Sequence, residues 1–293
     1  MSQYIHGHHS SVIASHGART AADSAAYLLP HLRPGMHVLD IGCGPGTITL
    51  DLAEAVAGER LPRGPEPAGA GPESARTGSL GPRARGRVVG LENTPAPLET
   101  ARANAATRGD TSTEWVIGDA YELPYGDDTF DVTHAHQVLQ HLTDPVAALR
   151  EMARVTKPGG LVAARDADYG GMIWYPELPG LTKWLDAYRR TARAAGGEPD
   201  AARHMLAWAN AAGLGSDLQV TTSTWSYAGP EGRAFWGGQW VERATKSAFA
   251  TQSVAGGFAT QADLDEIADA WRTWSQHPDA WFAMLHTELL ARV

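Results

Sequence analysis

Short apolar runs and amphipathic stretches follow one another along the first 165 residues. This pattern predicts strands separated by helices. The expected strands are short apolar runs at residues 36–41, 87–91, 114–117, 130–134 and 161–165. The expected helices lie at residues 18–29, 47–57, 95–107 and 144–156. Strands that alternate with helices at this spacing are typical of a parallel sheet with helices on both faces, so we expect a doubly wound α/β fold.

The pattern lapses between Gly58 and Gly86, where seven glycines and five prolines occur in 29 residues. Leu61 and Leu80 are the only large aliphatic residues of this stretch. Such a composition buries too little apolar surface to offset the entropy lost on ordering. We therefore predict a flexible surface insertion at about residues 58–86, without a catalytic role, and a partner-docking role for it stays open.

Aromatic residues dominate the second half of the chain. Nine of the ten tryptophans lie from Trp174 onward. Helical patterns occupy about residues 180–195, 199–212, 231–250 and 261–276, around a strand-like stretch at 218–227. Residues 281–290 fit a strand or a helix, because periodicity alone does not separate the two in a short apolar run. We expect three parts: an N-terminal lid and helix (1–35), a core (36–165), and an aromatic-rich cap with the final strands (166–293).

Length, charge and cysteine content narrow the class of protein. A chain of 293 residues fits one large α/β domain or a domain with a cap. The net charge of -9 repels phosphate backbones, so we do not expect a nucleic-acid partner. No apolar run approaches the roughly 20 residues that span a bilayer, and residues 1–10 are polar, so we expect a cytoplasmic protein without a membrane partner. The single cysteine, Cys43, agrees with a reducing compartment and excludes a cysteine-rich metal site.

The sharpest motif runs from Asp40 to Thr47 and reads Asp-Ile-Gly-Cys-Gly-Pro-Gly-Thr. Its glycines allow a tight turn and let the backbone approach a ligand at the positive end of the following helix. Glu92 ends the second expected strand, where a carboxylate accepts hydrogen bonds from ribose hydroxyls. The insertion at 58–86 lies between the glycine turn and Glu92, which explains why the two are far apart in the sequence. A nicotinamide-dependent oxidoreductase is disfavoured, because dinucleotide folds usually carry Gly-x-Gly-x-x-Gly instead.

Residues 38–46, Val-Leu-Asp-Ile-Gly-Cys-Gly-Pro-Gly, resemble the first motif of class I S-adenosylmethionine-dependent methyltransferases. Three later stretches resemble the same family in the same order: Val88–Glu92, Gly118–Asp131 and Val138–Pro145. The resemblance covers residues 36–165 and is to the branch that methylates quinone precursors and many specialised metabolites. It implies a Rossmann-like, mostly parallel sheet of seven strands, with S-adenosylmethionine as the cofactor.

The resemblance also assigns donor-binding roles to the residues that match the family's motifs. These are Asp40, Gly42, Cys43, Gly44 and Gly46 for the methionine part, Glu92 and Asn93 for the ribose, Asp119 and Ala120 for the adenine, and His134 and Gln137 for the methyl side. Many relatives carry aspartate and then a small residue where this chain has Glu92-Asn93. Glutamate keeps two acceptor oxygens, so ribose recognition is expected to survive the change.

The acceptor is expected beyond the carboxyl ends of the strands, where open α/β sheets bind ligands. Candidates for orienting or deprotonating it are Tyr4 and His9 in the lid and Asp166 and Tyr169 after the fifth strand. Candidates for contacting it are His136, Trp174 and Trp236. Aromatic walls suit a flat acceptor. The histidines at positions 6, 8 and 9 and at 134, 136 and 141 lack an accompanying carboxylate pattern, so we expect no metal.

These observations predict methyl transfer to a small, aromatic metabolite. The whole chain resembles bacterial specialised-metabolism methyltransferases, some of which methylate C3 of an indole in tryptophan-derived cyclic dipeptides. An O- or N-methyltransferase of another metabolite, and a donor-binding protein without catalysis, stay open as alternatives. A homo-oligomer through the cap is also left open.

Overall fold

A single seven-stranded sheet organises the chain in the computed structural model, which describes residues 17–57 and 86–293. The strands are β1 (His37–Ile41), β2 (Arg87–Glu92), β3 (Glu114–Ile117), β4 (Phe130–His136), β5 (Thr156–Tyr175), β6 (Leu218–Tyr227) and β7 (Trp281–Arg292). Their order in the sheet is β3-β2-β1-β4-β5-β7-β6, parallel from β3 to β5 and antiparallel at β7 and β6. The predicted Rossmann-like, mostly parallel sheet is confirmed, and residues 281–290 belong to a strand.

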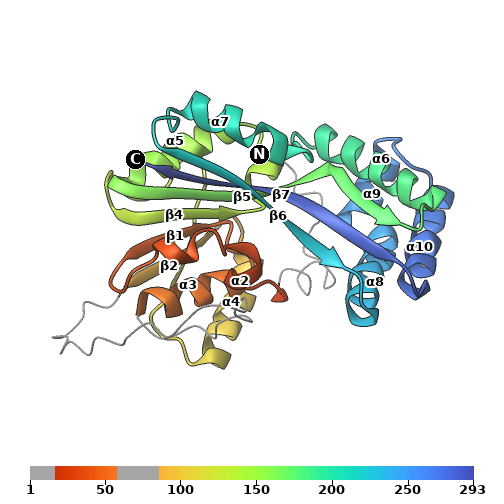
Figure 1. Cartoon of the computed structure of the whole chain (residues 1–293), viewed down its shortest axis with the longest axis horizontal. Coiled ribbons are helices and arrows are strands. Elements are labelled where there is room, and N and C mark those ends of the chain that lie inside the picture. Colours follow the sequence, from red (N-terminus) through yellow and green to blue (C-terminus); the bar gives the residue numbers. More distant parts are fainter. Residues whose placement is uncertain (1–16, 58–85) are drawn as a thin grey trace, which may run out of the picture.

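Helices cover both faces of the sheet and form the cap (Figure 1). The α-helices are α2 (Ala21–Ser24), α3 (Thr47–Ala57), α4 (Pro95–Arg108), α5 (Pro145–Val155), α6 (Pro179–Ala194), α7 (Met205–Ala212), α8 (Pro230–Lys246), α9 (Ala248–Ala255) and α10 (Gln261–Gln276). Three short 3-10 helices are η1 (Leu29–His31), η2 (Leu139–His141) and η3 (Ala201–His204). One aliphatic core joins the sheet to α5 and α7, and another joins its opposite face to α2 and α3.

Two predicted helices differ from the observed ones. The helix expected at 18–29 is reduced to the four residues of α2, because the backbone leaves the helical region at Ala25 (φ -137°, ψ 22°). The helix expected at 231–250 is two helices that meet at Ser247. Ser247 is extended (φ -93°, ψ 174°), and its hydroxyl accepts from the Phe249 amide to cap the second helix. The predicted lid residues 1–16 and insertion residues 58–85 lie outside the described part of the chain.

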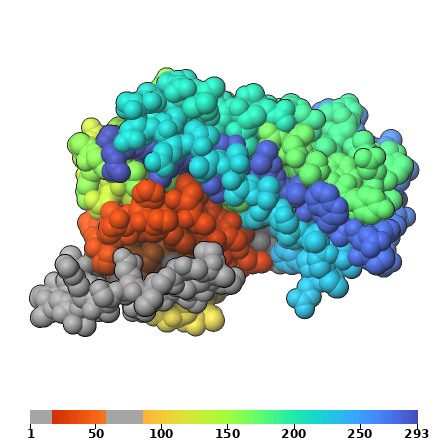
Figure 2. All heavy atoms as spheres, in the orientation of Figure 1, coloured from red at the N-terminus to blue at the C-terminus, as the bar shows by residue number. Residues whose placement is uncertain are grey.

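β5 is far longer than the five residues expected from its apolar run. It begins at Thr156, passes through Pro158 and the two following glycines, and continues to Tyr175. Antiparallel pairing with β7 extends from Leu161 to Tyr175, with a register shift after Asp168. Figure 1 shows β5, β6 and β7 running from the core into the cap, and Figure 2 shows β6 on the surface between the two. Pairing with β7, which is distant in the chain, therefore carries β5 well beyond its apolar run, as far as Tyr175.

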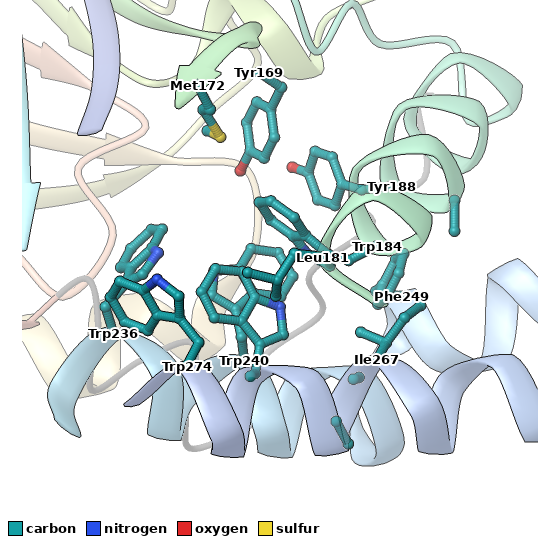
Figure 3. Close-up of a cluster of buried hydrophobic side chains, with 14 of the residues drawn as sticks. Tyr169, Met172, Leu181, Trp184, Tyr188, Trp236, Trp240, Phe249, Ile267 and Trp274 are labelled. Carbon is teal, nitrogen blue, oxygen red and sulfur yellow. The ribbon is translucent and has the colours of Figure 1, made fainter. Parts of the chain in front are cut away.

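A cluster of aromatic side chains forms the core of the cap (Figure 3). Trp184 lies near its centre, with its ring edge-on to Trp240 at 4.6 Å between centroids and to Trp271 at 4.9 Å. All three side chains are fully buried. Edge-to-face packing brings the positive ring edge to the negative ring face, so these contacts add to the stability gained from burial. The cluster is therefore a packed core that holds the helices of the cap against β5 and β7.

Candidate active site

The turn between β1 and α3 carries three glycines in the left-handed region. Their φ angles are 65° at Gly42, 55° at Gly44 and 76° at Gly46. A Cβ at Gly42 would lie 2.5 Å from Val138 Cγ2, and one at Gly46 would lie 2.4 Å from Trp115 Cη2. At Gly44 such a Cβ would meet no atom of the described residues within 4 Å. The first and last glycines are thus required by packing, and the middle one leaves open space beside the backbone for a ligand.

Glu92 lies directly against this turn. Its Oε1 accepts from the Gly44 amide at 2.9 Å and its Oε2 accepts from the Asn93 amide at 3.1 Å. Burial raises the pKa of Glu92, and the two amide hydrogen bonds oppose that shift. The Glu92 carbonyl accepts from the Gly118 amide at 2.9 Å, which places exposed Asp119 and half-buried Ala120 beside the same turn. The residues expected at the ribose and adenine therefore lie together at one edge of the sheet.

Cys43, inside the turn, is buried, and burial raises the pKa of its thiol well above the ordinary value. The neighbouring carboxylates of Asp40 and Glu92 shift the pKa in the same direction. A protonated thiol is a weak nucleophile. In this structure Cys43 contributes its backbone amide, which donates to the Leu91 carbonyl at 3.1 Å, and a small packed side chain.

Asp40 and His134 form a buried pair below the turn. Asp40 Oδ1 lies 2.7 Å from His134 Nδ1, and Asp40 Oδ2 accepts from the Thr49 hydroxyl at 2.5 Å. His134 Nε2 has no hydrogen-bond partner among the described residues. In the tautomer that donates from Nδ1 to Asp40, Nε2 presents its lone pair. The Asp40 carboxylate thus binds Thr49 and His134, and its role at the methionine part of the donor stays a prediction.

Gln137 follows β4 with φ at 53°, an uncommon value for a residue with a side chain. Its Oε1 accepts from Arg19 Nη2 at 2.7 Å, and its Nε2 lies 2.9 Å from His286 Nε2. His286 Nδ1 lies 3.1 Å from the Met284 carbonyl, so that nitrogen is the donor and Nε2 accepts from Gln137. These side-chain hydrogen bonds hold Gln137 in its strained backbone conformation and connect the end of β4 to β7. His286 was not expected from the sequence.

His136 lies beside this network and stacks on His286 with 6.3 Å between ring centroids. Neither of its ring nitrogens has a hydrogen-bond partner within the described ranges. Burial, and then the positive charges of Arg19 and Arg165, hold the pKa of His136 well below its ordinary value. The pKa of His286 is lowered for the same reasons. Both imidazoles are therefore neutral at pH 7.

The remaining predicted acceptor residues fall into two groups. Asp166 is buried, and its carboxylate accepts from the Leu139 and Gln140 amides at 3.3 and 3.2 Å at the start of η2. Burial raises the pKa of Asp166 to about 7. The aromatic candidates belong to the cap cluster, where each ring stacks on a neighbour: Tyr169 on Tyr188 at 4.1 Å, Trp174 on Phe282 at 6.1 Å, and Trp236 on Tyr227 at 4.6 Å. Tyr4 and His9 lie outside the described residues.

No group of three histidine, cysteine, aspartate or glutamate side chains is arranged to hold a metal ion in residues 17–57 and 86–293. In those same ranges no helix combines the length and apolar character needed to cross a membrane.

A glycine turn from a buried strand into a helix, with an acid from the next strand hydrogen-bonded to it, is the arrangement with which Rossmann-like folds bind a nucleotide. Residues 32–198 match the family model described as a methyltransferase domain, and the chain belongs to that family. It is an S-adenosylmethionine-dependent methyltransferase. The open space at Gly44 and the Glu92 carboxylate beside it fit this donor.

Similar proteins support the assignment over nearly the whole chain. An uncharacterized methyltransferase of Schizosaccharomyces pombe is 29% identical over 295 residues, which cover 98% of this chain and 95% of the relative. A probable methyltransferase of Aspergillus luteorubrus is 28% identical over 310 residues, covering 98% and 96%. The crystal structure of YcgJ from Bacillus subtilis has a TM-score of 0.54 at 18% identity, covering 91% of this chain and 96% of that one, a likeness of fold.

Proposed function

We propose that this methyltransferase acts on a small aromatic acceptor, which binds between the glycine turn and the aromatic cluster of the cap. The observation that carries the proposal is a change of side-chain chemistry along one face of the sheet. Residues that pair across neighbouring strands lie on the same face. Following the register of these pairs from the core to the cap therefore traces the surface that a bound acceptor would meet.

Three rows of paired residues mark this change. The first is aliphatic, with Val132 beside Leu161; the second is polar, with His136, Arg165 and Glu288; the third is aromatic, with Trp174, Phe282 and Tyr227. Glu288 and Phe282 are six residues apart on β7, or about 20 Å at the rise of a strand. The polar row follows the buried pair of Asp40 and His134 by two residues on β4. An acceptor with an aromatic ring and polar groups matches this sequence of surfaces.

On this proposal the donor-binding roles fall to the residues around the turn. The Glu92 carboxylate binds the ribose, Asp119 and Ala120 border the adenine, and the amide of Gly44 lies against the methionine part. His134 and Gln137 face the methyl end, and His134 Nε2 has no partner among the described residues. Asp40 orients His134 through its bond to Nδ1.

The bound donor supplies an electrophilic methyl group on a sulfonium. The protein's task in an in-line displacement is to align the acceptor and, where needed, to take up its proton. His136 suits the first task, because it is buried and has two ring nitrogens without partners in the described part of the chain. Its lowered pKa makes it a weak base, so its role is to orient the acceptor by hydrogen bonding. Asp166 is the positioning residue for η2, since both of its oxygens accept backbone amides. Tyr169, Trp174 and Trp236 form the aromatic border of the acceptor site.

Within this proposal the acceptor is an indole methylated at C3, as in a tryptophan-derived cyclic dipeptide. A flat bicyclic ring suits the Trp174 and Trp236 border, and a proton acceptor at the indole N–H raises the nucleophilicity of C3. Methylation of an oxygen or nitrogen of another metabolite uses the same alignment, and only the position of the new methyl group separates the two.

Calorimetric titration with S-adenosylmethionine, S-adenosylhomocysteine and NAD tests the donor site. We expect the first two to bind the wild type and to bind Glu92→Ala at least about tenfold more weakly, since a charge-assisted hydrogen bond is lost. Glu99→Ala, at an exposed acid on α4, is the matched control and should bind like the wild type. Equal affinity in both variants would remove Glu92 from the donor site.

The acceptor is tested with methyl-labelled donor and a panel of indoles, phenols and aryl amines, with the product located by NMR. Transfer to an indole C3 supports the finer proposal, and transfer to oxygen or nitrogen supports the alternative. Binding of the donor with no transfer to any aromatic compound would contradict an aromatic acceptor.

A further inference from the structure

A buried guanidinium in the polar row has more donors than the described residues satisfy. Arg165 is fully buried. Its Nε donates to the Ser223 hydroxyl at 3.1 Å and lies 3.5 Å from Glu288 Oε1. Nη1 and Nη2 have no hydrogen-bond partner among the described residues. Removing a cation from water costs several kcal/mol, and unmade hydrogen bonds add to that cost.

The side chains around Arg165 do not neutralise it fully. Glu288 also accepts from the Thr221 hydroxyl at 2.8 Å through its other oxygen, so it shares its charge between two strands. The Trp225 ring lies 4.9 Å from the Arg165 guanidinium carbon, and the Arg19 guanidinium carbon lies 5.2 Å from the same ring. A second cation nearby makes the region more positive. An added group with electron-rich oxygens would be attracted to it.

Two other side chains near Arg165 also have buried polar atoms without a hydrogen-bond partner among the described residues. The Tyr27 hydroxyl is buried without a partner in the described ranges, and Arg165 is the first charged group that acts on its pKa. His136 pairs with Arg165 across β4 and β5, and its two ring nitrogens are also unpartnered there. Buried polar groups are nearly always hydrogen-bonded in folded proteins, so a gathering of exceptions calls for an explanation.

We propose that Arg165 binds an oxygen of the methyl acceptor, a carbonyl or a carboxylate, through Nη1 and Nη2, with Tyr27 and His136 beside it. The proposal rests on the proposed function and deepens it: the acceptor is an aromatic ring that carries such an oxygen on a short arm. The ring lies toward the aromatic cluster and the oxygen lies in the polar row. Arg165 is thereby the residue that selects oxygen-bearing acceptors over purely aromatic ones.

Two matched pairs of probes test this selection by calorimetry on enzyme saturated with S-adenosylhomocysteine. One pair is 3-methylindole and indole-3-acetamide; the other is 4-methylphenol and 4-hydroxyphenylacetamide. In the wild type we expect the amide of at least one pair to bind about tenfold more tightly or better, as for hydrogen bonds to a charged group. In Arg165→Gln that advantage should disappear while the affinity of the methyl compound is kept.

Two further variants keep the test decisive. Arg203→Gln is the control, because Arg203 is paired with Asp168 through two bonds of 2.7 and 2.6 Å, and the amide advantage should persist there. If Arg165→Gln fails to fold with Glu288 unpaired, the double variant Arg165→Gln/Glu288→Gln removes both charges and should lose the advantage in the same way.

The outcomes separate this inference from the donor assignment. An amide advantage that survives in both Arg165 variants, or that no pair shows in the wild type, overturns the inference, and so does failure of all four probes to bind. If Arg165→Gln loses affinity for S-adenosylhomocysteine by the same factor as for the amides, the guanidinium belongs to the donor site. That result would also overturn the inference. Failure of the wild type to bind S-adenosylhomocysteine at all counts against the proposed donor site, and the probe pairs are then compared on the protein alone.

Discussion

Replacement of Gly44 by alanine separates the strain of the glycine turn from its contact with the donor. Gly44 has φ at 55°, and a Cβ there meets no atom of the described residues within 4 Å. Folding should therefore lose only the cost of a left-handed alanine, about 1–2 kcal/mol. For a chain of this size, each kcal/mol lowers the melting temperature by about 2–4 °C.

The donor should be affected more than the fold. The new methyl group occupies the space from which a ligand approaches the Gly44 amide, so the donor loses that close contact. Because the Gly44 amide already donates to Glu92, the loss comes from steric overlap with the donor, and an overlap that costs about 1.4 kcal/mol or more gives at least about a tenfold weaker affinity for S-adenosylhomocysteine. Isothermal titration calorimetry measures the affinity, and thermal unfolding measures the stability.

Gly109 provides a matched control for this experiment. It follows α4 with φ at 72°, and a Cβ there also meets no atom of the described residues within 4 Å. Gly109→Ala should therefore cost similar stability and leave donor binding unchanged. Wild-type affinity in Gly44→Ala would refute the placement of the donor against this turn. A similar loss of affinity in Gly109→Ala would show that strain alone weakens binding.

Three other perturbations follow from the structure. Trp184→Ala removes a fully buried ring from the cap and should lower the free energy of unfolding by about 3–5 kcal/mol in a denaturant titration; a loss under 1 kcal/mol would argue against a packed cluster. Asp40→Asn removes the charged acceptor of His134 Nδ1, so the NMR signal of that N–H should shift or vanish and donor affinity should fall; an unchanged signal contradicts the pair. Burial lowers the pKa of His141 to about 4 in the folded state, so unfolding takes up a proton between that value and the ordinary 6.5. Its contribution is complete above pH 6.5 and falls by up to about 1.4 kcal/mol per pH unit below it. His141→Asn should flatten that slope in denaturant titrations at pH 7 and pH 5, and an unchanged slope would rule out this source.

The donor half of the site could be predicted from sequence because its signals are local. The glycine turn, the strand before it and the helix after it are adjacent in the chain, and Glu92 ends the next strand. In any sheet of this class, left-handed glycines after a strand indicate a tight ligand-binding turn, and a carboxylate at the end of the next strand indicates a ribose-binding residue. The insertion at 58–86 lengthens the chain between the glycine turn and Glu92, and both signals can still be recognised.

The acceptor half depends on pairing between distant segments and was predicted only in part. Arg165 and His286 come together because β5 pairs with β7 in a particular register, which no local pattern reveals. A charged residue at the end of the apolar run 161–165 was the one available signal for Arg165. Residues 281–290 were ambiguous because most of β7 is buried on both faces, which removes the alternation that marks a strand.

The local role of Asp166 was likewise hidden from the sequence. A carboxylate after a strand reads equally well as a base or as an anchor for backbone amides. Its two bonds to η2 depend on the segment after β4 lying against the middle of β5, where Asp166 pairs with Thr287 of β7. The competing uses of one side chain are settled by tertiary contacts, and residue type alone does not distinguish them.

The long ladder between β5 and β7 also limits how the enzyme can move. Enzymes that enclose substrates by hinge bending need a few residues that absorb the rotation between two lobes. Here a hinge between core and cap would have to break backbone hydrogen bonds along strands that cross both parts. Opening a cleft between core and cap would therefore have to bend the uninterrupted ladder of β6 and β7, which pairs from Leu218 to Tyr227.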